Sequence, residues 1–213
     1  WKAMVADKAA RTTFAKNIKT VLEKNKLDGI DLDFEWAENE KEYKDYSLAI
    51  LKMREVLGDK YLFSVSLHPV CYKISKEAIE AVDFISLQCY GPSPVRFPIE
   101  KYCSDIQMVL EYGIPKEKLV AGVPFYGVTK DNSKKTEAYF NFVQNGLVTS
   151  PAQNEVIYQG DTYVFDGQDN IRIKTRYAKE QKLKGMMSWD LATDLPLSDS
   201  RSLLKTMTEE LRE

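Results

Sequence analysis

The feature that most constrains the fold is the alternation of short apolar runs with longer amphipathic segments. The runs are rich in β-branched and aromatic residues, which is typical of buried strands, and they occupy residues 29–36, 61–67, 82–90, 119–126 and 185–191. Helical spacing of apolar residues predicts helices over residues 10–25, 43–58, 99–113 and 198–213. This alternation predicts parallel strands with helical crossovers, arranged as an open doubly wound sheet or as a closed (β/α)8 barrel.

The alternation of predicted strands and helices is interrupted once, over residues 128–171. The runs "NEVIYQG" and "DTYVFDG" predict a small hairpin, and "TEAYFNFVQNG" predicts a short helix before it. We interpret this stretch as a small α+β insertion within a single domain that spans residues 1–213. No Gly-rich phosphate loop follows any predicted strand, which weakens the nucleotide-binding version of the open sheet.

Composition excludes several classes of function. The formal net charge of -2 predicts no general attraction to nucleic acid or to a membrane surface, and no apolar run approaches the roughly 20 residues that span a bilayer. Three widely spaced cysteines, Cys71, Cys89 and Cys103, are not a disulfide framework. The single histidine, His68, argues against histidine-rich metal sites, and its simplest role is structural. Catalysis by this chain would therefore rest on carboxylates, tyrosines and tryptophans.

The segment "LDGIDLDFEW", residues 27–36, places acids and large apolar residues in strict alternation. In a strand, Ile30, Leu32 and Phe34 would pack against helices, and the three acids Asp31, Asp33 and Glu35 would share the opposite face. In a parallel barrel that face is the interior, where burial and like charge would raise the pKa of at least one carboxyl. A carboxyl held protonated in this way is a general acid.

Glu35 comes last in this segment, at the carboxyl end of the strand, where barrel active sites lie. The pattern therefore favours Glu35 as the acid and Asp33 as its partner. Two alternatives remain from the residues alone. The acids could form a solvent-facing strand surface, or their oxygens could bind a cation.

The same segment resembles the D-x-x-D-x-D-x-E signature of glycoside hydrolase family 18, the chitinase and endo-β-N-acetylglucosaminidase family. The match is complete at Asp28, Asp31, Asp33 and Glu35. Three later segments, "DFISLQCYG", "LVAGVPFYG" and "GMMSWDL", resemble the sixth, seventh and eighth strands of that family in order and spacing. The resemblance implies a (β/α)8 barrel of the TIM type, and it covers nearly the whole chain.

The family also implies a retaining mechanism in which the substrate's own acetamido group takes part. By this resemblance, Glu35 is the general acid and base, Asp33 orients the acetamide, Asp31 tunes Asp33, and Tyr90 donates to the acetamido oxygen. The sugar-binding residues would be Trp189, which stacks under a sugar ring, with Tyr126, Trp36 and Gln88 lining neighbouring walls. Asp28 is expected to be structural. No metal or cofactor is expected.

The chain departs from the family pattern at a few positions. Gly91 stands where many members have Asp, Gln88 takes the usual place of Met, and Val128 follows the Phe-Tyr-Gly segment where Arg is frequent. These changes affect the expected substrate preference more than the chemistry. The short insertion predicts a shallower groove than that of processive chitinases.

A barrel of this kind needs about 250 residues, and only about five strands are predicted here. The first residues resemble the segment that leads to the fourth strand of the family. We therefore expect a partial barrel, from about the fourth strand to the end, with an upstream segment of the same barrel as a partner. Without that segment, the chain is expected to be poorly stable and inactive.

The leading functional hypothesis is hydrolysis of β-1,4 bonds next to N-acetylglucosamine in chitin-type oligosaccharides. The alternatives are an endo-β-N-acetylglucosaminidase acting on N-glycans or peptidoglycan-like glycans, and a non-catalytic chitinase-like glycan-binding protein. The presence of Glu35 argues against the last of these. The expected partner is an oligo- or polysaccharide that contains N-acetylglucosamine, with no nucleic acid and no membrane span. The location of such polymers predicts an extracellular, periplasmic or cell-surface protein.

Overall fold

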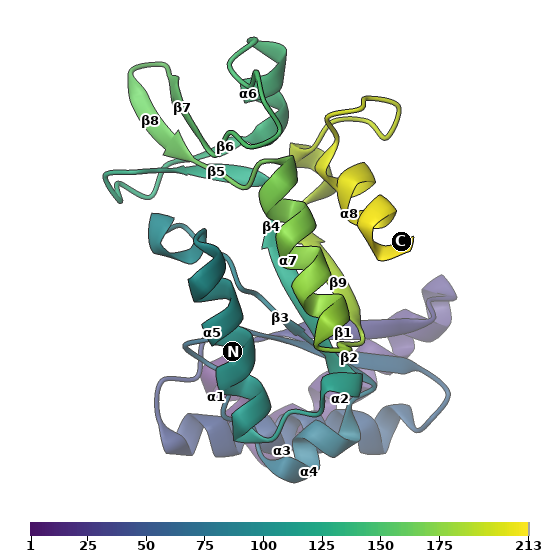
Figure 1. Cartoon of the computed structure of the whole chain (residues 1–213). Coiled ribbons are helices and arrows are strands. Elements are labelled where there is room, and N and C mark those ends of the chain that lie inside the picture. Colours follow the sequence, from purple (N-terminus) through teal and green to yellow (C-terminus); the bar gives the residue numbers. More distant parts are fainter. Residues whose placement is uncertain (213) are drawn as a thin grey trace. The chain divides into compact units, whose positions relative to one another are not determined.

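Strands and helices alternate along the chain as the hydrophobic pattern predicts (Figure 1). The computed structural model describes residues 1–212 and divides the chain into two compact units. The first unit comprises residues 1–87 and 109–119, and the second comprises 88–108 and the chain from 120 onward. The helix α5 (Ile99–Tyr112) contributes residues to both units.

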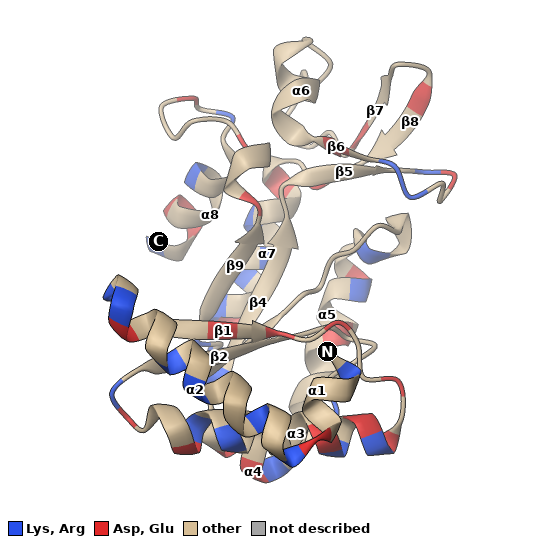
Figure 2. Ribbon diagram, turned by 180° about the vertical axis from the view of Figure 1, so that it is seen from behind, with Lys and Arg blue, Asp and Glu red and all other residues tan. Residues whose placement is uncertain are grey.

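The first unit contains three parallel strands with helices between them. The strands are β1 (Gly29–Asp33), β2 (Leu62–Leu67) and β3 (Phe84–Leu87). The helices are α1 (Lys2–Ala6), α2 (Lys8–Asn25), α3 (Glu40–Leu57) and α4 (Lys76–Ala81), with a 3-10 turn η2 (Lys116–Lys118). Helices α2, α3 and α4 lie along one face of β1 and β2 (Figures 1 and 2), as right-handed crossovers require.

The register of this sheet aligns one polar row across its strands. Asp33 pairs with Ser66, and Ser66 pairs with Ser86. Since paired residues of parallel strands share a face, the acids of β1 lie beside small hydroxyl side chains. Gly29 opens β1 because a Cβ there would lie 2.1 Å from the carbonyl oxygen of Leu62.

The core of the first unit lies between the opposite face of the strands and α3. Leu32, Phe63 and Val65 are buried against this helix. The hydroxyl of buried Tyr46 donates to the Leu32 carbonyl oxygen at 3.0 Å, and burial first, then Asp31 and Asp33, raises the pKa of that phenol. The helix α3 begins at an Asn39 cap, and its exposed surface alternates acidic and basic residues (Figure 2).

The second unit combines two parallel strands with a separate antiparallel sheet. The parallel pair is β4 (Leu119–Pro124) and β9 (Gly185–Trp189). The antiparallel sheet has the order β6-β5-β8-β7 and consists of β5 (Tyr126–Thr129), β6 (Thr136–Ala138), β7 (Glu155–Tyr158) and β8 (Asp161–Val164). The other elements are η1 (Pro94–Arg96), α6 (Tyr139–Gln144), α7 (Gln168–Glu180), η3 (Leu191–Thr193) and α8 (Leu203–Arg212).

The predicted insertion contains the expected hairpin, formed by β7 and β8, and the expected short helix α6. Several boundaries differ from the prediction. The predicted strand 29–36 ends at Asp33, so Glu35 follows the strand and does not lie on it. The predicted strand 119–126 is divided, because residues up to Pro124 pair in parallel with β9, whereas the chain from Tyr126 onward pairs antiparallel with β6. The stretch 128–171 also includes the first residues of α7, which continues to Glu180 and leads to β9.

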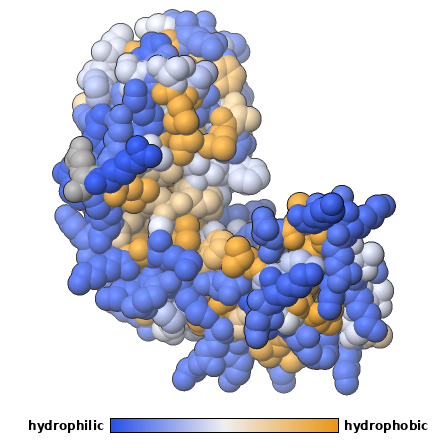
Figure 3. All heavy atoms as spheres, turned by 90° about the vertical axis from the view of Figure 1, so that its right-hand side faces the viewer, coloured by the Kyte–Doolittle hydropathy of each residue, from blue (hydrophilic) through white to orange (hydrophobic). Residues whose placement is uncertain are grey.

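No described helix is long and apolar enough to cross a bilayer. The face shown in Figure 3 is mostly hydrophilic and carries separate hydrophobic patches. The exposed large apolar residues include Leu62, Val70, Ile157 and Leu191.

Candidate active site

The acids of β1 lie on one face of the strand, as the alternation predicts. Leu32 and Phe34 are 3% and 2% exposed on the other face, whereas Asp31, Asp33 and Glu35 are exposed. The expected burial of these acids is therefore not found. In the described residues, β1 pairs along one edge only, with β2, and β2 places small serines beside the acids, so the carboxyls remain accessible.

Two serines of β2 hold Asp31. Ser64 Oγ donates to Asp31 Oδ1 at 2.6 Å, and Ser66 Oγ donates to Asp31 Oδ2 at 2.7 Å. Each carboxylate oxygen therefore has its own hydroxyl donor, which fixes the plane of the group. The sequence prediction missed both serines, although their alternation with Phe63, Val65 and Leu67 in "YLFSVSL" was a usable signal.

The segment that carries Glu35 is anchored on both sides. Before it, the ring of Phe34 packs on Tyr46 with 4.9 Å between centroids. After it, the Ala37 amide donates to Cys71 Sγ at 3.2 Å, and the Trp36 ring makes an edge contact with His68 at 4.9 Å. The Glu35–Trp36 peptide bond is cis. Glu35 thus stands at the carboxyl end of β1 on a segment whose neighbours are fixed.

His68 has a structural environment, in line with the role expected of it. It is buried, it forms a bridge with Cys71, and its Nδ1 accepts from the Val70 amide at 3.2 Å. The contacts of Trp36 with His68 and of Ala37 with Cys71 join this loop after β2 to the loop after β1. Both loops follow the carboxyl ends of parallel strands, where ligands of such folds bind.

The remaining predicted residues belong to the second unit. Trp189 ends β9 and is 55% exposed, whereas Tyr90 and Gln88 are buried. Tyr90 makes an edge contact with Tyr126, with 6.5 Å between ring centroids. Its hydroxyl lies 3.5 Å from Met187 Sδ. The described structure thus groups Asp31, Asp33, Glu35 and Trp36 in one unit and Gln88, Tyr90, Tyr126 and Trp189 in the other.

Tyr126 is held by a hydrogen bond to Gly91, one of the positions at which this chain departs from the family pattern. Its hydroxyl donates to the Gly91 carbonyl oxygen at 3.2 Å. Burial raises the pKa of this phenol well above its usual value, so it stays a neutral donor. Tyr126 is the first residue of β5 and not the last of the preceding parallel strand. The chain passes at this point from the parallel sheet into the antiparallel sheet, where Tyr126 pairs with Ala138.

An exposed pocket of about 320 Å³ surrounds Trp189 within the second unit. Its lining comprises Pro92, Tyr126, Thr136, Glu137, Ala138, Trp189, Asp190 and Thr193. Asp190 and Thr193 form a capping box at the start of η3, in which the Asp190 carboxylate accepts from the Thr193 amide at 3.1 Å. Sequence reasoning missed Glu137, Asp190 and Thr193. The "DLAT" spacing after β9 signals the capping box, whereas nothing marks Glu137.

No group of three His, Cys, Asp or Glu side chains within residues 1–212 is arranged to hold a metal ion. The three cysteines are free thiols. The chemistry available in the described residues is that of two accessible carboxylates on β1, a third just beyond its end at Glu35, and an aromatic platform at Trp189 beside Glu137 and Asp190.

Comparison with known proteins decides the family. Residues 1–194 match Glycosyl hydrolases family 18. This chain belongs to that family. The fold class is accordingly the α/β barrel of family 18, as the sequence predicts, and the five parallel strands with their helices are part of such a barrel.

Among curated family 18 relatives, the chain is similar to Probable chitinase 2 of Drosophila melanogaster, with 23% identity over 91% of this chain and 53% of that protein. It spans between 38% and 65% of the length of the first three curated relatives that it matches. Among solved structures, a family 18 chitinase from the chitin utilization locus of Flavobacterium johnsoniae is 27% identical, with a TM-score of 0.81 over 99% of this chain and 68% of that one.

Two further solved structures share the fold at lower identity. A family 18 chitinase from Cycas revoluta in complex with (GlcNAc)3 is 18% identical, with a TM-score of 0.81 over 99% of this chain and 75% of that one. A chitinase-like agglutinin from Robinia pseudoacacia is also 18% identical, with a TM-score of 0.82 over 98% of this chain and 75% of that one. The fold of this family 18 chain therefore occurs in both an enzyme and an agglutinin.

Proposed function

We propose that this chain carries the catalytic carboxylates of a glycosidase that cleaves β-1,4 bonds next to N-acetylglucosamine in chitin-type oligosaccharides. The observation that carries the proposal is the row of accessible acids on one face of β1, with Glu35 directly after the carboxyl end of that strand. Membership of family 18 and the similarity to chitinases support it. The complex of the Cycas revoluta chitinase with (GlcNAc)3 supports this class of ligand.

The proposed reaction retains configuration and uses the substrate's acetamido group. The acetamido oxygen attacks the anomeric carbon as the glycosidic bond breaks, and the Glu35 carboxyl gives its proton to the departing oxygen. Water then attacks the same carbon, returns the acetamido group to its neutral form and gives a proton back to Glu35. Each turnover consumes one water and needs no other reactant.

The other acids of β1 would position and stabilise the reacting sugar. Asp33 would accept from the acetamide N–H and offset the positive charge of the cyclic intermediate. Asp31, held by Ser64 and Ser66, would keep Asp33 oriented. Because the side chains of these acids are already held in place, they need to reorient less during the reaction than flexible surface acids would.

Residues of the second unit would supply the remaining sugar contacts. Trp189 offers an exposed indole face on which a sugar ring can stack. Tyr90 would donate its hydroxyl to the acetamido oxygen. Tyr126, Gln88 and, in the first unit, Trp36 would form the surrounding walls.

The decisive experiment compares the wild-type chain with Glu35→Gln on chitotetraose, an N-glycan and a muropeptide glycan, using the longest parent protein that contains the chain. We expect hydrolysis of chitotetraose by the wild type and no turnover by Glu35→Gln, which should keep its affinity for the oligosaccharide. Glu23→Gln is the matched control, since Glu23 is exposed on α2. Full activity in Glu35→Gln would remove Glu35 from the mechanism.

The products also separate the alternative functions. Preferred cleavage of the N-glycan or the muropeptide glycan would favour an endo-β-N-acetylglucosaminidase or a peptidoglycan-like substrate. Binding without hydrolysis in the wild type would favour a glycan-binding protein, a role for which the agglutinin provides a precedent in fold alone. We also propose that the protein acts outside the cytoplasm, where these polymers lie, which fractionation of the source cells would test.

A further inference from the structure

The loop that follows β3 carries Tyr90, the proposed donor to the acetamido oxygen. From Gln88 to Ser93 the chain forms neither helix nor strand, and η1 then begins at Pro94. Without the ladder hydrogen bonds of a strand, such a loop is positioned by its contacts with the rigid elements around it. The position of Tyr90 therefore depends on the residues that tie this loop to its neighbours.

The far end of the loop is tied to α5 by a buried ion pair. Arg96 is the last residue of η1, and its Nη1 donates to Oδ2 of Asp105 on α5 at 2.9 Å. The Arg96 side chain is 12% exposed, and that of Asp105 is 2% exposed. Solvent and salt screen such a pair only weakly. Arg96 thus fixes the end of the loop to a helix.

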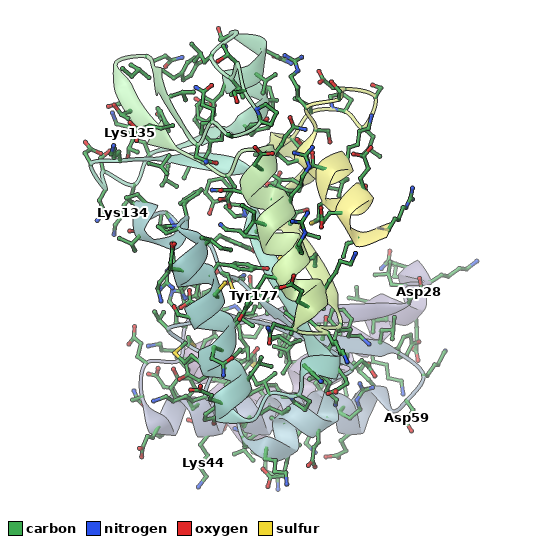
Figure 4. All side chains as sticks on the ribbon, in the orientation of Figure 1. Asp28, Lys44, Asp59, Lys134, Lys135 and Tyr177 are labelled. Atoms are coloured by element: carbon green, nitrogen blue, oxygen red, sulfur yellow. The ribbon has the colours of Figure 1, made fainter. Side chains whose placement is uncertain are left out.

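The helix that receives Arg96 is a firm support. Tyr102 of α5 is fully buried and makes an edge contact with Tyr177 of α7, with 6.2 Å between ring centroids (Figure 4). Phe97, directly after Arg96, is buried as well, and the Lys174 ammonium of α7 lies 6.0 Å from its ring centroid. The end of the loop and its support are therefore packed together on α7.

The same ion pair also acts on the residue directly before Tyr90. Burial raises the pKa of the Cys89 thiol, and Asp105 raises it further. Lys174 and Arg96 oppose this shift. Electrostatic effects of this kind weaken with distance, so the charges lie close to Cys89. All of these residues belong to the second unit, and the ion pair thus supports the loop on both sides of Tyr90.

We propose that Arg96 is a positioning residue for the proposed reaction and acts through the loop that carries Tyr90. Its bond to Asp105 holds the end of the loop, and the Tyr126 bond to Gly91 holds the loop at a second point. The Tyr90 hydroxyl then meets the acetamido group with little reorganisation. Arg96 needs no contact with the sugar. This inference rests on the proposed function, because it requires that Tyr90 acts on the substrate.

The double pairing of Asp105 makes a specific test possible. Lys101, four residues earlier on α5, bonds to the other oxygen of the same carboxylate. Arg96→Met therefore leaves the buried acid with a counter-ion and should fold. Lys101→Met is the matched control, since it removes the other base from the same acid without releasing the loop from α5.

The test is steady-state kinetics on chitotetraose, using the longest parent protein that contains the chain. We expect Arg96→Met to lower kcat by at least about 10-fold, because a small misplacement of a reacting group is costly. KM should be nearly unchanged, since the Tyr90 bond is made in the transition state. Lys101→Met should keep kcat within about 2-fold of the wild type, because no reacting group moves.

Two further substitutions at Arg96 complete the series. Arg96→Gln also removes the charge, and it carries the same expectation if Arg96→Met fails to fold. Arg96→Lys retains a charged donor to Asp105 and should recover most of the lost kcat, which a residue that only fills space would not require.

A double-mutant cycle shows whether Arg96 acts through Tyr90. Tyr90→Phe alone should lower kcat, and adding Arg96→Met should cause little further loss, because the hydroxyl to be positioned is already absent. Additive losses, an equal loss in Lys101→Met, or wild-type kcat in Arg96→Met and Arg96→Gln would overturn this inference alone. Wild-type kcat in Tyr90→Phe would remove Tyr90 from the proposed function, and the role of Arg96 with it.

Discussion

At the residue scale, the acids of β1 have the same chemistry but different surroundings. Asp31 receives two hydroxyl donors from β2, whereas Glu35 stands free of the strand on an anchored segment. A carboxylate with both oxygens bonded is a poor proton donor, and an accessible carboxyl at the strand end can reach a glycosidic oxygen. The different surroundings of Asp31 and Glu35 thus suit Asp31 to a positioning role and Glu35 to proton transfer.

Asp33 provides a direct test of electrostatic stabilisation. The Asp33→Asn variant keeps the size of the side chain and removes its charge, so the positively charged intermediate loses a stabiliser. We expect kcat on chitotetraose to fall by more than about 100-fold, the usual cost of losing such a group. A fall of only a few-fold in steady-state kinetics would contradict this role.

Ser66 is predicted to act by positioning Asp31. The Ser66→Ala variant removes one of the two donors, and a hydrogen bond to a charged group contributes about 1.5–3 kcal/mol. Because Ser66 is partly exposed, we expect the lower end of this range, about a 10-fold loss of kcat/KM. Ser66→Thr restores a hydroxyl and should recover most of it, which a purely structural role would not require. Ser104→Ala, at an exposed site on α5, is the control.

At the element scale, a single acid joins three elements of the first unit. Asp83, just before β3, accepts from the Phe63 amide of β2 at 2.7 Å and from Arg54 of α3 at 2.8 Å. Partial burial opposes the charged form, but these two donors outweigh it, and the pKa of Asp83 is lowered from its usual value of 3.8. Asp83 therefore helps to hold the strands on the helix layer.

This shift predicts a pH dependence of stability. Since the folded pKa is below the unfolded one, the stabilisation is complete above about pH 4 and is lost as pH falls through the folded pKa. We expect Asp83→Asn to lower the free energy of unfolding at pH 7 by about 1–2 kcal/mol and to lose less on acidification than the wild type. Urea unfolding at pH 7 and pH 3 measures both. Asp59→Asn, at an exposed turn (Figure 4), should change neither.

At the scale of the whole molecule, the second unit contains a fully buried ion pair. Lys174 Nζ lies 2.6 Å from Asp166 Oδ2, with both side chains inaccessible to solvent. The lysine also lies over the rings of Tyr102 and Phe97. Burial raises the pKa of Asp166, and Lys174 opposes this shift. The pair joins α7 to the segment that follows β8.

Removing one partner of this pair should be costly. Lys174→Met leaves a buried carboxylate without its counter-ion, and we expect a loss of about 3–5 kcal/mol in the free energy of unfolding. The double variant Lys174→Met with Asp166→Leu replaces both charges by apolar groups and should recover much of that loss. Denaturant titration of both variants tests this, and equal stability of the single and double variants would contradict it.

The patterns that are local in sequence were predicted well. All five parallel strands, helices α2, α3, α5 and α8, and the hairpin of the insertion correspond to predicted segments. The faces of β1 also follow from alternation, since side-chain direction in a strand has a period of two. The division at Phe125 was missed because it depends on a change of pairing partner from β9, which is more than sixty positions away, to β6.

The sequence by itself determined the elements, the row of acids and the family signature, because periodicity and spacing are properties of neighbouring residues. Only the tertiary structure decided that Ser64 and Ser66 hold Asp31 and that Glu137 shares a pocket with Trp189. It also left the acids of β1 accessible. These features depend on strand register and on which distant segments meet, and no local pattern in the chain specifies either.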